Sequence, residues 1–311
     1  MAKIVQLSRF RSPPPEAPWW VVRREMIPAS PERVWQALTD PEEMVHWWCD
    51  CAEVRLEKGG RYAFGGRHVY GDPMETRAIE TAVKPGEDFE IVDFEPAARL
   101  VFRWSLLGVE TLVRYELENE LESTRLTVTQ TARVPPGWNP GSGPNWWWVA
   151  LPSLRTFIEK GESDLRIDYH GLRSAGAISL EARCSTFPWI IWHKLTSPTE
   201  IRRWWAPVIQ LEPRAGGTFR LELDTMGPSR VLETSELSRF VHDWVWPGGA
   251  VGQIEWSLEE TETCIILRVT DLGPWDPAIS RDAGATLWGA TLLQLKQLSE
   301  RGVTPREYQD G

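Results

Sequence analysis

The sequence is poor in the features that mark several common classes of protein. It has only four cysteines among 311 residues, Cys49, Cys51, Cys184 and Cys264, and their spacing fits no disulfide framework, which is typical of a reducing compartment. Acidic residues outnumber basic ones by 44 to 34, so we expect no basic surface for nucleic acid. No apolar run has the length of a membrane span, and the first residues lack the apolar core of a signal peptide. These absences predict a cytoplasmic protein with neither a membrane span nor a nucleic-acid partner.

Motifs for metal binding and catalysis are also missing. His46, Cys49 and Cys51 are residue types that ligate metals, but Cys-x-Cys is shorter than the spacing of structural zinc sites, and no fourth ligand is evident. The second copy of this segment, described below, has Arg203, Ala206 and Val208 instead. No Ser-His-Asp set, phosphate-binding loop or carboxylate pair is readable. We therefore expect no metal and no cofactor.

Tryptophan, by contrast, is abundant, with 19 residues, and it reveals an internal repeat. The string WQALTDPEEMVHWW at 35–48 recurs as WHKLTSPTEIRRWW at 192–205, with seven of fourteen positions identical. The same offset of 157 aligns Gly59-Gly60 with Gly216-Gly217, and LRTFIEKG at 154–161 matches LKQLSERG 141 residues later. The second copy is thus 16 residues shorter. The repeated unit has the size of a domain, so the chain is a tandem duplication.

Composition and the repeat together predict the domain limits. We expect an extended lead-in over 1–18, a first domain over 19–161, a linker over 162–176, a second, shortened domain over 177–303, and a tail over 304–311.

Hydrophobic periodicity predicts the same order of elements in each copy. An apolar strand precedes two short helices, the first capped by Ser30 with Pro31 at its first position. Residues then alternate between apolar and polar, as in strands with one wet face. The copy closes with a long helix that places Trp147 or Trp288 on its apolar face. We expect an α+β fold in which a curved antiparallel sheet wraps around this helix and leaves a cavity between them.

The residues IPASPERVWQALTDPEEMVHWW at 27–48, with the Gly-Gly pair and EPAARLVFRW at 95–104, resemble the START-like (SRPBCC) superfamily. Within it, the AHSA-like branch, named after the activator of the heat-shock protein 90 ATPase, is the most similar. The resemblance covers residues 21–161 and, more weakly, 177–302. It implies two helix-grip domains, each with a deep cavity, and roles that range from carrying apolar ligands to polyketide cyclisation.

Side chains with inward parity are the candidate ligand-binding residues. They come from the alternating strands, the closing helices and one Pro- and Gly-rich loop. They are Tyr62, Phe64, Phe102, Trp104, Tyr115, Trp138, Trp147, Leu151, Leu154, Phe240, Trp244, Trp246, Trp256 and Trp288. Trp138, with Trp275 in the second copy, is a candidate lid at the cavity mouth, although a stiff loop pinned by one aromatic ring explains it as well.

The repeated Trp-Trp pairs raise a separate question. Adjacent residues on a helix point about 100° apart, so a pair cannot place both rings in one core. We expect Trp47 and Trp204 to fill core, and Trp48 and Trp205 to line a cavity, meet the other domain or lie exposed.

Two histidines are weak catalytic candidates. His242 occupies the position of Phe102 and is expected to point inward. His68 shares the parity of Tyr62 and Phe64, unless a bulge at Gly65-Gly66 turns it away. Such a histidine can act as acid or base, but a core histidine satisfied by a hydrogen bond is more common.

Three functional hypotheses follow. The leading one is binding of an apolar, aromatic small molecule in the cavity, with the longer first copy as the preferred pocket. The second is a START-like cyclase, dehydratase or hydrolase that uses His68 or His242 on a polycyclic substrate. The third is a protein-interaction module, such as a co-chaperone or stress-related protein. The sequence does not determine the oligomeric state.

Overall fold

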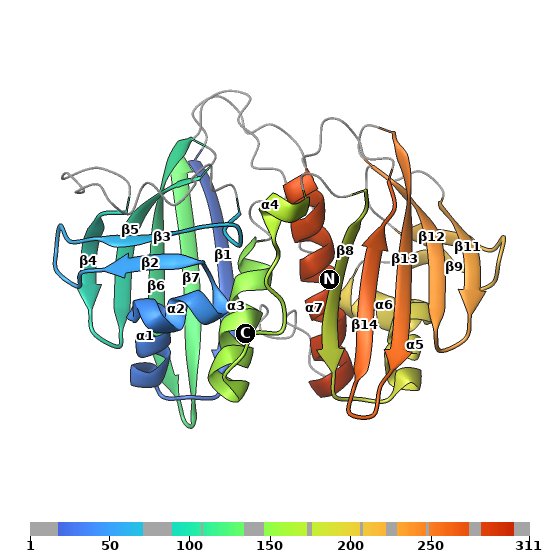
Figure 1. Ribbon diagram of the computed structural model, residues 1–311, viewed down its shortest axis with the longest axis horizontal. Helices are drawn as coiled ribbons and strands as arrows, with labels where there is room; N and C mark the ends of the chain where they lie inside the picture. The colour runs from blue at the N-terminus through green and yellow to red at the C-terminus, as the bar shows by residue number, and fades with distance from the viewer. Residues whose placement is uncertain are drawn as a thin grey trace. The chain divides into compact units, whose positions relative to one another are not determined.

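The computed structural model describes nine stretches of the chain: residues 18–70, 89–106, 108–133, 146–172, 176–205, 208–221, 229–246, 249–273 and 281–301. The chain divides into two compact units, and the boundary lies between Gly171 and Leu172. Figure 1 shows that each unit combines an antiparallel sheet with helices. Each unit is described by itself below.

The first unit is built on a five-stranded sheet with the order β1-β7-β6-β5-β4, and a two-stranded sheet β2-β3. Its elements in chain order are β1 (Pro18–Ile27), α1 (Pro31–Thr39), α2 (Pro41–Trp47), β2 (Cys51–Val54), β3 (Tyr62–Gly65), β4 (Ile91–Glu95), β5 (Arg99–Leu106), β6 (Val109–Glu120), β7 (Ser123–Arg133), α3 (Trp147–Lys160) and α4 (Tyr169–Leu172). An antiparallel bridge between Arg61 and Glu90 links the two sheets.

The second unit repeats this order in one seven-stranded sheet, β8-β14-β13-β12-β11-β10-β9. Its elements are β8 (Ile178–Cys184), α5 (Pro188–Thr196), α6 (Pro198–Trp204), β9 (Val208–Leu211), β10 (Thr218–Leu221), β11 (Ser229–Ser235), β12 (Arg239–Val245), β13 (Val251–Glu260), β14 (Ile265–Asp271) and α7 (Arg281–Arg301). Helix α3 packs against β1, and α7 packs against β8 and β14. The predicted fold class, two α+β helix-grip domains, is confirmed.

Local sequence explains where the short helices begin. Ser30 caps α1 by accepting a hydrogen bond from the backbone N–H of Arg33, and Pro31 occupies the first helical position. Asp40 ends α1 and caps α2, where its carboxylate accepts from the N–H of Glu42 at 2.9 Å. A proline at the start of a helix loses no intrahelical bond, so the Asp-Pro junction separates the two helices cleanly.

The repeated glycine pair has the same geometry in both units. Gly59 and Gly216 have φ values of 77° and 76°, which side-chain-bearing residues rarely adopt. At Gly60 an added Cβ would lie 2.2 Å from the carbonyl oxygen of Arg55, and at Gly217 the same distance from that of Glu212. The turn therefore needs glycine at both positions, once for φ and once for space.

The segment expected as a linker differs from the prediction. Its residues up to Gly171 belong to the first unit and are tied to that unit by hydrogen bonds. The Ser163 hydroxyl donates to the carbonyl oxygen of His46 at 3.0 Å, and the backbone N–H of Tyr169 donates to the carbonyl oxygen of Arg67 at 2.9 Å. We call residues 162–171 the strap. Polar composition suggested a solvated linker, but these polar groups are bonded within the unit.

Candidate functional site

The interior of the first unit, between its sheet and α3, is lined by aromatic rings from five regions of the chain. They come from the end of α2, from β3, from β5 and β6, and from the start of α3. The members are Trp47, Trp48, Tyr62, Phe64, Phe102, Trp104, Tyr115, Trp146 and Trp147, all of them buried. We call this set the first aromatic cluster.

Trp48 lies at the centre of the first aromatic cluster. Its ring centroid is 4.1 Å from that of Phe64, 5.3 Å from that of Trp47 and 5.6 Å from that of Trp146. Tyr62 and Trp147 follow at 6.0 and 6.2 Å. One indole thus connects α2, β3 and α3.

The expectation that the two rings of a Trp-Trp pair cannot share one core is wrong. Trp47 and Trp48 are both 2% exposed and stack on each other. The physical reason is that α2 ends at Trp47, so Trp48, with φ −119° and ψ −65°, follows the helix and is not bound by helical spacing. Trp204 and Trp205 repeat this arrangement at the end of α6, with ring centroids 5.4 Å apart.

Three polar side chains in the first aromatic cluster donate hydrogen bonds to acceptors in the same unit. The indole N–H of Trp47 donates to the carbonyl oxygen of Ala37 at 3.0 Å, and that of Trp147 donates to Oε1 of Gln130 at 2.9 Å. The Tyr62 hydroxyl donates to the carbonyl oxygen of Leu38 at 2.6 Å, and burial raises its pKa well above the usual value. Two buried polar atoms of the cluster have no hydrogen-bond partner, the Nε1–H of Trp48 and the hydroxyl oxygen of Tyr115. An orphan donor inside a domain calls for an explanation.

The second unit has an equivalent interior, which we call the second aromatic cluster. Its members come from α6, β10, β12, β13 and α7. They are Trp204, Trp205, Phe219, Phe240, His242, Trp244, Trp246, Trp256 and Trp288, and all are buried. Trp205 is central here too, 5.8 Å from Trp244 in a nearly parallel stack and 6.2 Å from Trp288.

The described candidate residues therefore point inward as predicted. All thirteen of them are buried: Tyr62, Phe64, Phe102, Trp104, Tyr115, Trp147, Leu151, Leu154, Phe240, Trp244, Trp246, Trp256 and Trp288. Their role in binding stays a prediction. Trp138 and Trp275 lie outside the described residues, so the proposed lids are not seen.

His242 points inward, as predicted, and both of its ring nitrogens are engaged. Nδ1 donates to the carbonyl oxygen of Asp243 at 2.8 Å, and Nε2 accepts from the indole N–H of Trp256 at 3.4 Å. Burial lowers its pKa to about 4, so the ring is neutral at physiological pH. These contacts are those of a core histidine, with no nitrogen left for proton transfer.

His68 does not point into the first aromatic cluster; of the two orientations that the sequence left open, the structure has the one turned away at Gly65-Gly66. Strand β3 ends at Gly65, and Gly66 has a φ of 113°, which turns the chain away. An added Cβ on Gly66 would also lie 2.3 Å from Oδ2 of Asp50. The His68 ring instead lies at the edge of the unit, where its Nδ1 is 2.7 Å from Oδ1 of Asp50.

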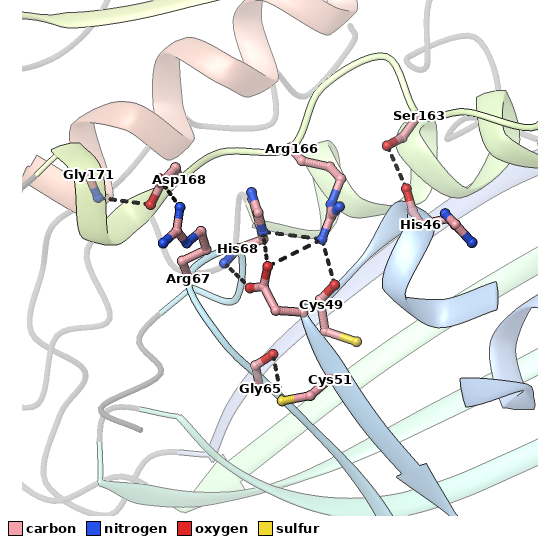
Figure 2. Close-up of polar contacts among 11 residues, drawn as sticks. His46, Cys49, Cys51, Gly65, Arg67, His68, Ser163, Arg166, Asp168 and Gly171 are labelled. Carbon is pink, nitrogen blue, oxygen red and sulfur yellow. Dashed lines mark hydrogen bonds and ion pairs between the residues drawn. The ribbon is translucent and has the colours of Figure 1, made fainter. Parts of the chain in front are cut away.

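Figure 2 shows how this polar edge holds the strap. Arg166 of the strap donates from Nη2 to the carbonyl oxygen of Cys49 at 2.5 Å and lies 3.8 Å from the Asp50 carboxylate. Arg67 pairs with Asp168 at 3.3 Å. Burial and the nearby Arg166 charge lower the pKa of His68, although Asp50 opposes the shift. The side chains form a latch between strap and unit.

Several of these residues were missed by sequence reasoning. Trp146 directly precedes Trp147, which was predicted to line the interior. Its place just before the helix gives no hydrophobic periodicity that would mark it as buried. Gln130 and Asp271 are buried acceptors for Trp147 and Trp288, and they occupy matching positions in the repeat. Aligning the polar residues of the two copies would have found them.

The fold and these two interiors define the class: two START-like domains in one chain, each with packed aromatic side chains between sheet and closing helix. The family model described as Activator of Hsp90 ATPase homolog 1-like protein matches residues 28–148 and 187–300. The chain belongs to this family. Among curated proteins, none matches the chain. No helix among the described residues is long and apolar enough to cross a membrane.

Several solved structures are similar to the chain. DynU16, a protein in the dynemicin biosynthetic locus, is 23% identical and covers 90% of this chain and 98% of its own, with a TM-score of 0.39. The Aha1 dimer from Colwellia psychrerythraea is 22% identical and covers 40% of this chain and 97% of its own, with a TM-score of 0.35. CalU16 from Micromonospora echinospora is 20% identical, with coverages of 47% and 88% and a TM-score of 0.33.

Proposed function

We propose that the first unit binds an apolar, aromatic small molecule between its sheet and α3. The observation that carries this proposal is the position of Trp48. Its indole is 2% exposed, has rings of the first aromatic cluster around it, and keeps an N–H without a partner. Flat ligands stack well on such rings, and one acceptor atom on the ligand satisfies the orphan N–H.

The packing sets a condition on binding. The ring centroids of its neighbours lie 4.1 to 6.2 Å from the centroid of Trp48. A ligand ring therefore does not fit between Trp48 and these rings unless at least one of them moves. Trp48 is the natural mover, since it follows the end of α2 and no hydrogen bond fixes its indole. Trp47 stays in place through its bond to Ala37. Ligand entry therefore swings Trp48 and keeps the rest of the interior.

Catalysis is less well supported by the same geometry. His242 has both ring nitrogens engaged, and His68 lies at the latch rather than against the first aromatic cluster. Neither candidate places a free nitrogen beside the rings that would hold a polycyclic substrate, so neither histidine supplies the base that a cyclase or hydrolase mechanism needs. Binding is accordingly the preferred function.

The test is a ligand search followed by mapping. Native mass spectrometry of freshly purified protein shows any molecule that it carries, and fluorene serves as the probe for titration. In protein labelled with 5-fluorotryptophan, single Trp→Phe variants assign the ¹⁹F resonances. We expect fluorene to shift the Trp48 and Trp146 resonances and leave that of Trp20, which is 64% exposed. No carried mass together with shifts only at exposed tryptophans would refute the proposal.

A second candidate function, protein binding, rests on a different surface. Phe187 and Trp189 at the start of α5 are 65% and 59% exposed, and exposed aromatic side chains are enriched at protein interfaces. Analytical ultracentrifugation of the chain and of a Phe187→Ser/Trp189→Ser variant tests whether this surface mediates self-association. Association that weakens at least tenfold in the variant supports it, and a monomer at all concentrations removes self-association as its purpose.

A further inference from the structure

Three neighbouring residues in the described part of the second unit each have a buried polar side-chain atom without a hydrogen-bond partner: Oγ of Ser229 and the Nε1 atoms of Trp244 and Trp246. The three residues are 2%, 5% and 3% exposed, respectively. Leaving one buried donor unpaired is costly, and native proteins rarely do so without a reason. Three such atoms in one unit suggest that something outside the chain completes them.

These atoms lie on one face of two neighbouring strands. Trp244 and Trp246 are two residues apart on and just after β12, and their ring centroids are 6.1 Å apart. Val231 of β11 pairs with His242 of β12, and the backbone of Arg230 donates a hydrogen bond to the Asp243 carboxylate. Continuing this antiparallel register by one more residue places Ser229 beside Trp244.

Helix α7 covers this face. The ring of Trp288 lies 4.8 Å from that of Trp244, and an added Cβ on Gly284 would lie 3.8 Å from the ring of Trp246. The rings of Trp244 and Trp246 therefore lie between the sheet, at β12, and the first half of α7, and the register places Ser229 of β11 beside them. This is the space in which a ligand of a helix-grip domain has a sheet on one side and a helix on the other.

The first unit lacks this polar set. Ile91 pairs with Phe102 there, as Val231 does with His242, so Phe89 stands at the position of Ser229. Leu106 stands at the position of Trp246. Neither residue has a polar side-chain atom, and of the three positions only that of Trp244 keeps its residue type, as Trp104. Ser229 and Trp246 are therefore features of the second unit and not by-products of the shared fold.

The neighbouring groups limit the chemistry of a ligand. Indole N–H groups only donate, so the ligand must accept. The Asp271 carboxyl lies behind Trp288, and its two oxygens already accept from Trp288 and from the N–H of Gly273. None of the side chains named at this site is cationic, so an anionic ligand would find no counter-charge there. His242 offers no further donor, because its nitrogens are engaged.

We propose that the second unit binds a neutral, flat aromatic ketone or quinone, whose carbonyl oxygen accepts hydrogen bonds from Trp244, Trp246 and Ser229. The rings of Trp205 and Trp244 are parallel to within 7°, and a flat ligand extends this stack. This site concerns other residues and another unit than the proposed function above, so either proposal stands without the other.

The experiment compares 9-fluorenone with fluorene, which has the same ring system without the carbonyl. The full chain, labelled with ¹⁵N-tryptophan, is titrated with each probe, and single Trp→Phe variants assign the indole N–H signals. We expect fluorenone, and not fluorene, to move the Trp244 and Trp246 signals downfield. Trp256 and Trp288 are internal controls, because their N–H groups already have acceptors in the chain.

The affinities give an independent readout. One good hydrogen bond is worth about a tenfold change in Kd, so fluorenone is expected to bind the second unit about tenfold more tightly than fluorene. Trp244→Phe/Trp246→Phe removes this preference, and Ser229→Ala, which changes one hydroxyl and preserves packing, reduces it. Equal affinity for the two probes, a preference that survives both variants, or shifts confined to Trp48 would overturn the proposal. Shifts at Trp48 alone would leave the proposed function of the first unit intact.

Discussion

The indole N–H of Trp256 donates to Nε2 of His242, and the opposite nitrogen of the same ring donates to a backbone carbonyl oxygen. The first unit has Phe102 and Tyr115 at these two positions, with ring centroids 5.4 Å apart. A histidine-tryptophan pair has thus replaced a phenylalanine-tyrosine pair in the duplicated domain. The exchange places a histidine, which titrates nearer to neutral pH than tyrosine does, where the first unit has Phe102.

This pair makes the second unit sensitive to acid. Burial lowers the pKa of His242 from 6.5 to about 4, so the unfolded chain binds more protons between these values. The contribution of the neutral His242 to the free energy of unfolding is fully present above pH 6.5 and is lost as the pH falls towards 4. It amounts to about 3 kcal/mol in the free energy of unfolding. Urea denaturation between pH 4 and 7 measures it.

A matched variant isolates the histidine. His242→Phe alone removes the acid sensitivity but leaves the N–H of Trp256 unpaired, at a cost of about 1 to 3 kcal/mol. His242→Phe/Trp256→Tyr recreates the pair of the first unit and is expected to recover part of that loss. If the single variant keeps the full pH dependence, another group is responsible.

The glycine turn gives a prediction that is the same in both units. Gly60→Ala and Gly217→Ala place a Cβ 2.2 Å from a backbone oxygen, and we expect each to reduce the free energy of unfolding by about 3 kcal/mol. Gly59→Ala and Gly216→Ala are the controls, because their Cβ atoms meet nothing within 4 Å. They lose about 1 kcal/mol through the left-handed conformation alone. Thermal denaturation of the four variants ranks them, and equal losses would contradict the steric argument.

Much of the fold was predictable, since the duplicated pattern supplied each assignment twice. Strands such as β13 and β14 alternate strictly between buried and more exposed residues, and this period is visible in sequence. The end of α2 at Trp47 was predicted, but the place of Trp48 was missed, because helical spacing was assumed for a residue whose backbone angles, φ −119° and ψ −65°, differ from those of a helix. The strap was missed because its partners, such as the carbonyl oxygen of Cys49, lie 117 residues away. A backbone acceptor leaves no trace in side-chain patterns.

The polar set of the second unit was hidden for a similar reason. Ser229 follows a stretch whose pattern shows no strand start, and its place beside Trp244 depends on the register between β11 and β12. Whether an indole N–H finds a partner depends on atoms from several elements at once. Sequence reasoning therefore gave the apolar lining of both interiors and missed the hydrogen-bond groups within them.

The strap is expected to loosen when its arginine is removed. Arg166→Met deletes the bond to Cys49 and the contact with Asp50, and we expect amide exchange in residues 163–171 to accelerate about tenfold. Arg67→Met, which removes only an exposed ion pair with Asp168, is the control and changes exchange little. Mass spectrometry of peptides from the strap measures both.

Acid is expected to loosen the strap in the same way. The pKa of His68 is lowered by burial and by Arg166, so protonation places a second positive charge beside Arg166 as the pH falls below about 6.5. Exchange corrected for its intrinsic pH dependence should then rise in the wild type and not in His68→Gln. A strap whose exchange is independent of pH would contradict this role of His68.

Gln130 and Asp271 hold equivalent tryptophans, and yet they are not interchangeable. Gln130 accepts from Trp147 through Oε1 and donates through Nε2 to the hydroxyl of Thr111 at 2.8 Å. That hydroxyl already donates to the carbonyl oxygen of Trp104 at 2.7 Å. Gln130→Glu therefore brings a carboxylate oxygen against a lone pair, and we expect a loss of about 3 kcal/mol at pH 7.

The pH dependence of this loss separates hydrogen bonding from packing. Glutamate has nearly the shape of glutamine, so a packing effect is small and independent of pH. A buried carboxyl has a raised pKa, and once protonated it donates to Thr111 as the amide does. The loss in Gln130→Glu should therefore shrink as the pH falls from 7 to 5, measured by urea denaturation against wild type at each pH.

In Asp271→Asn the amide N–H instead meets a donor, either Trp288 or the backbone of Gly273, and lowering the pH does not restore the lost hydrogen bond. Equal pH profiles for the two variants would show that the two positions act through packing alone.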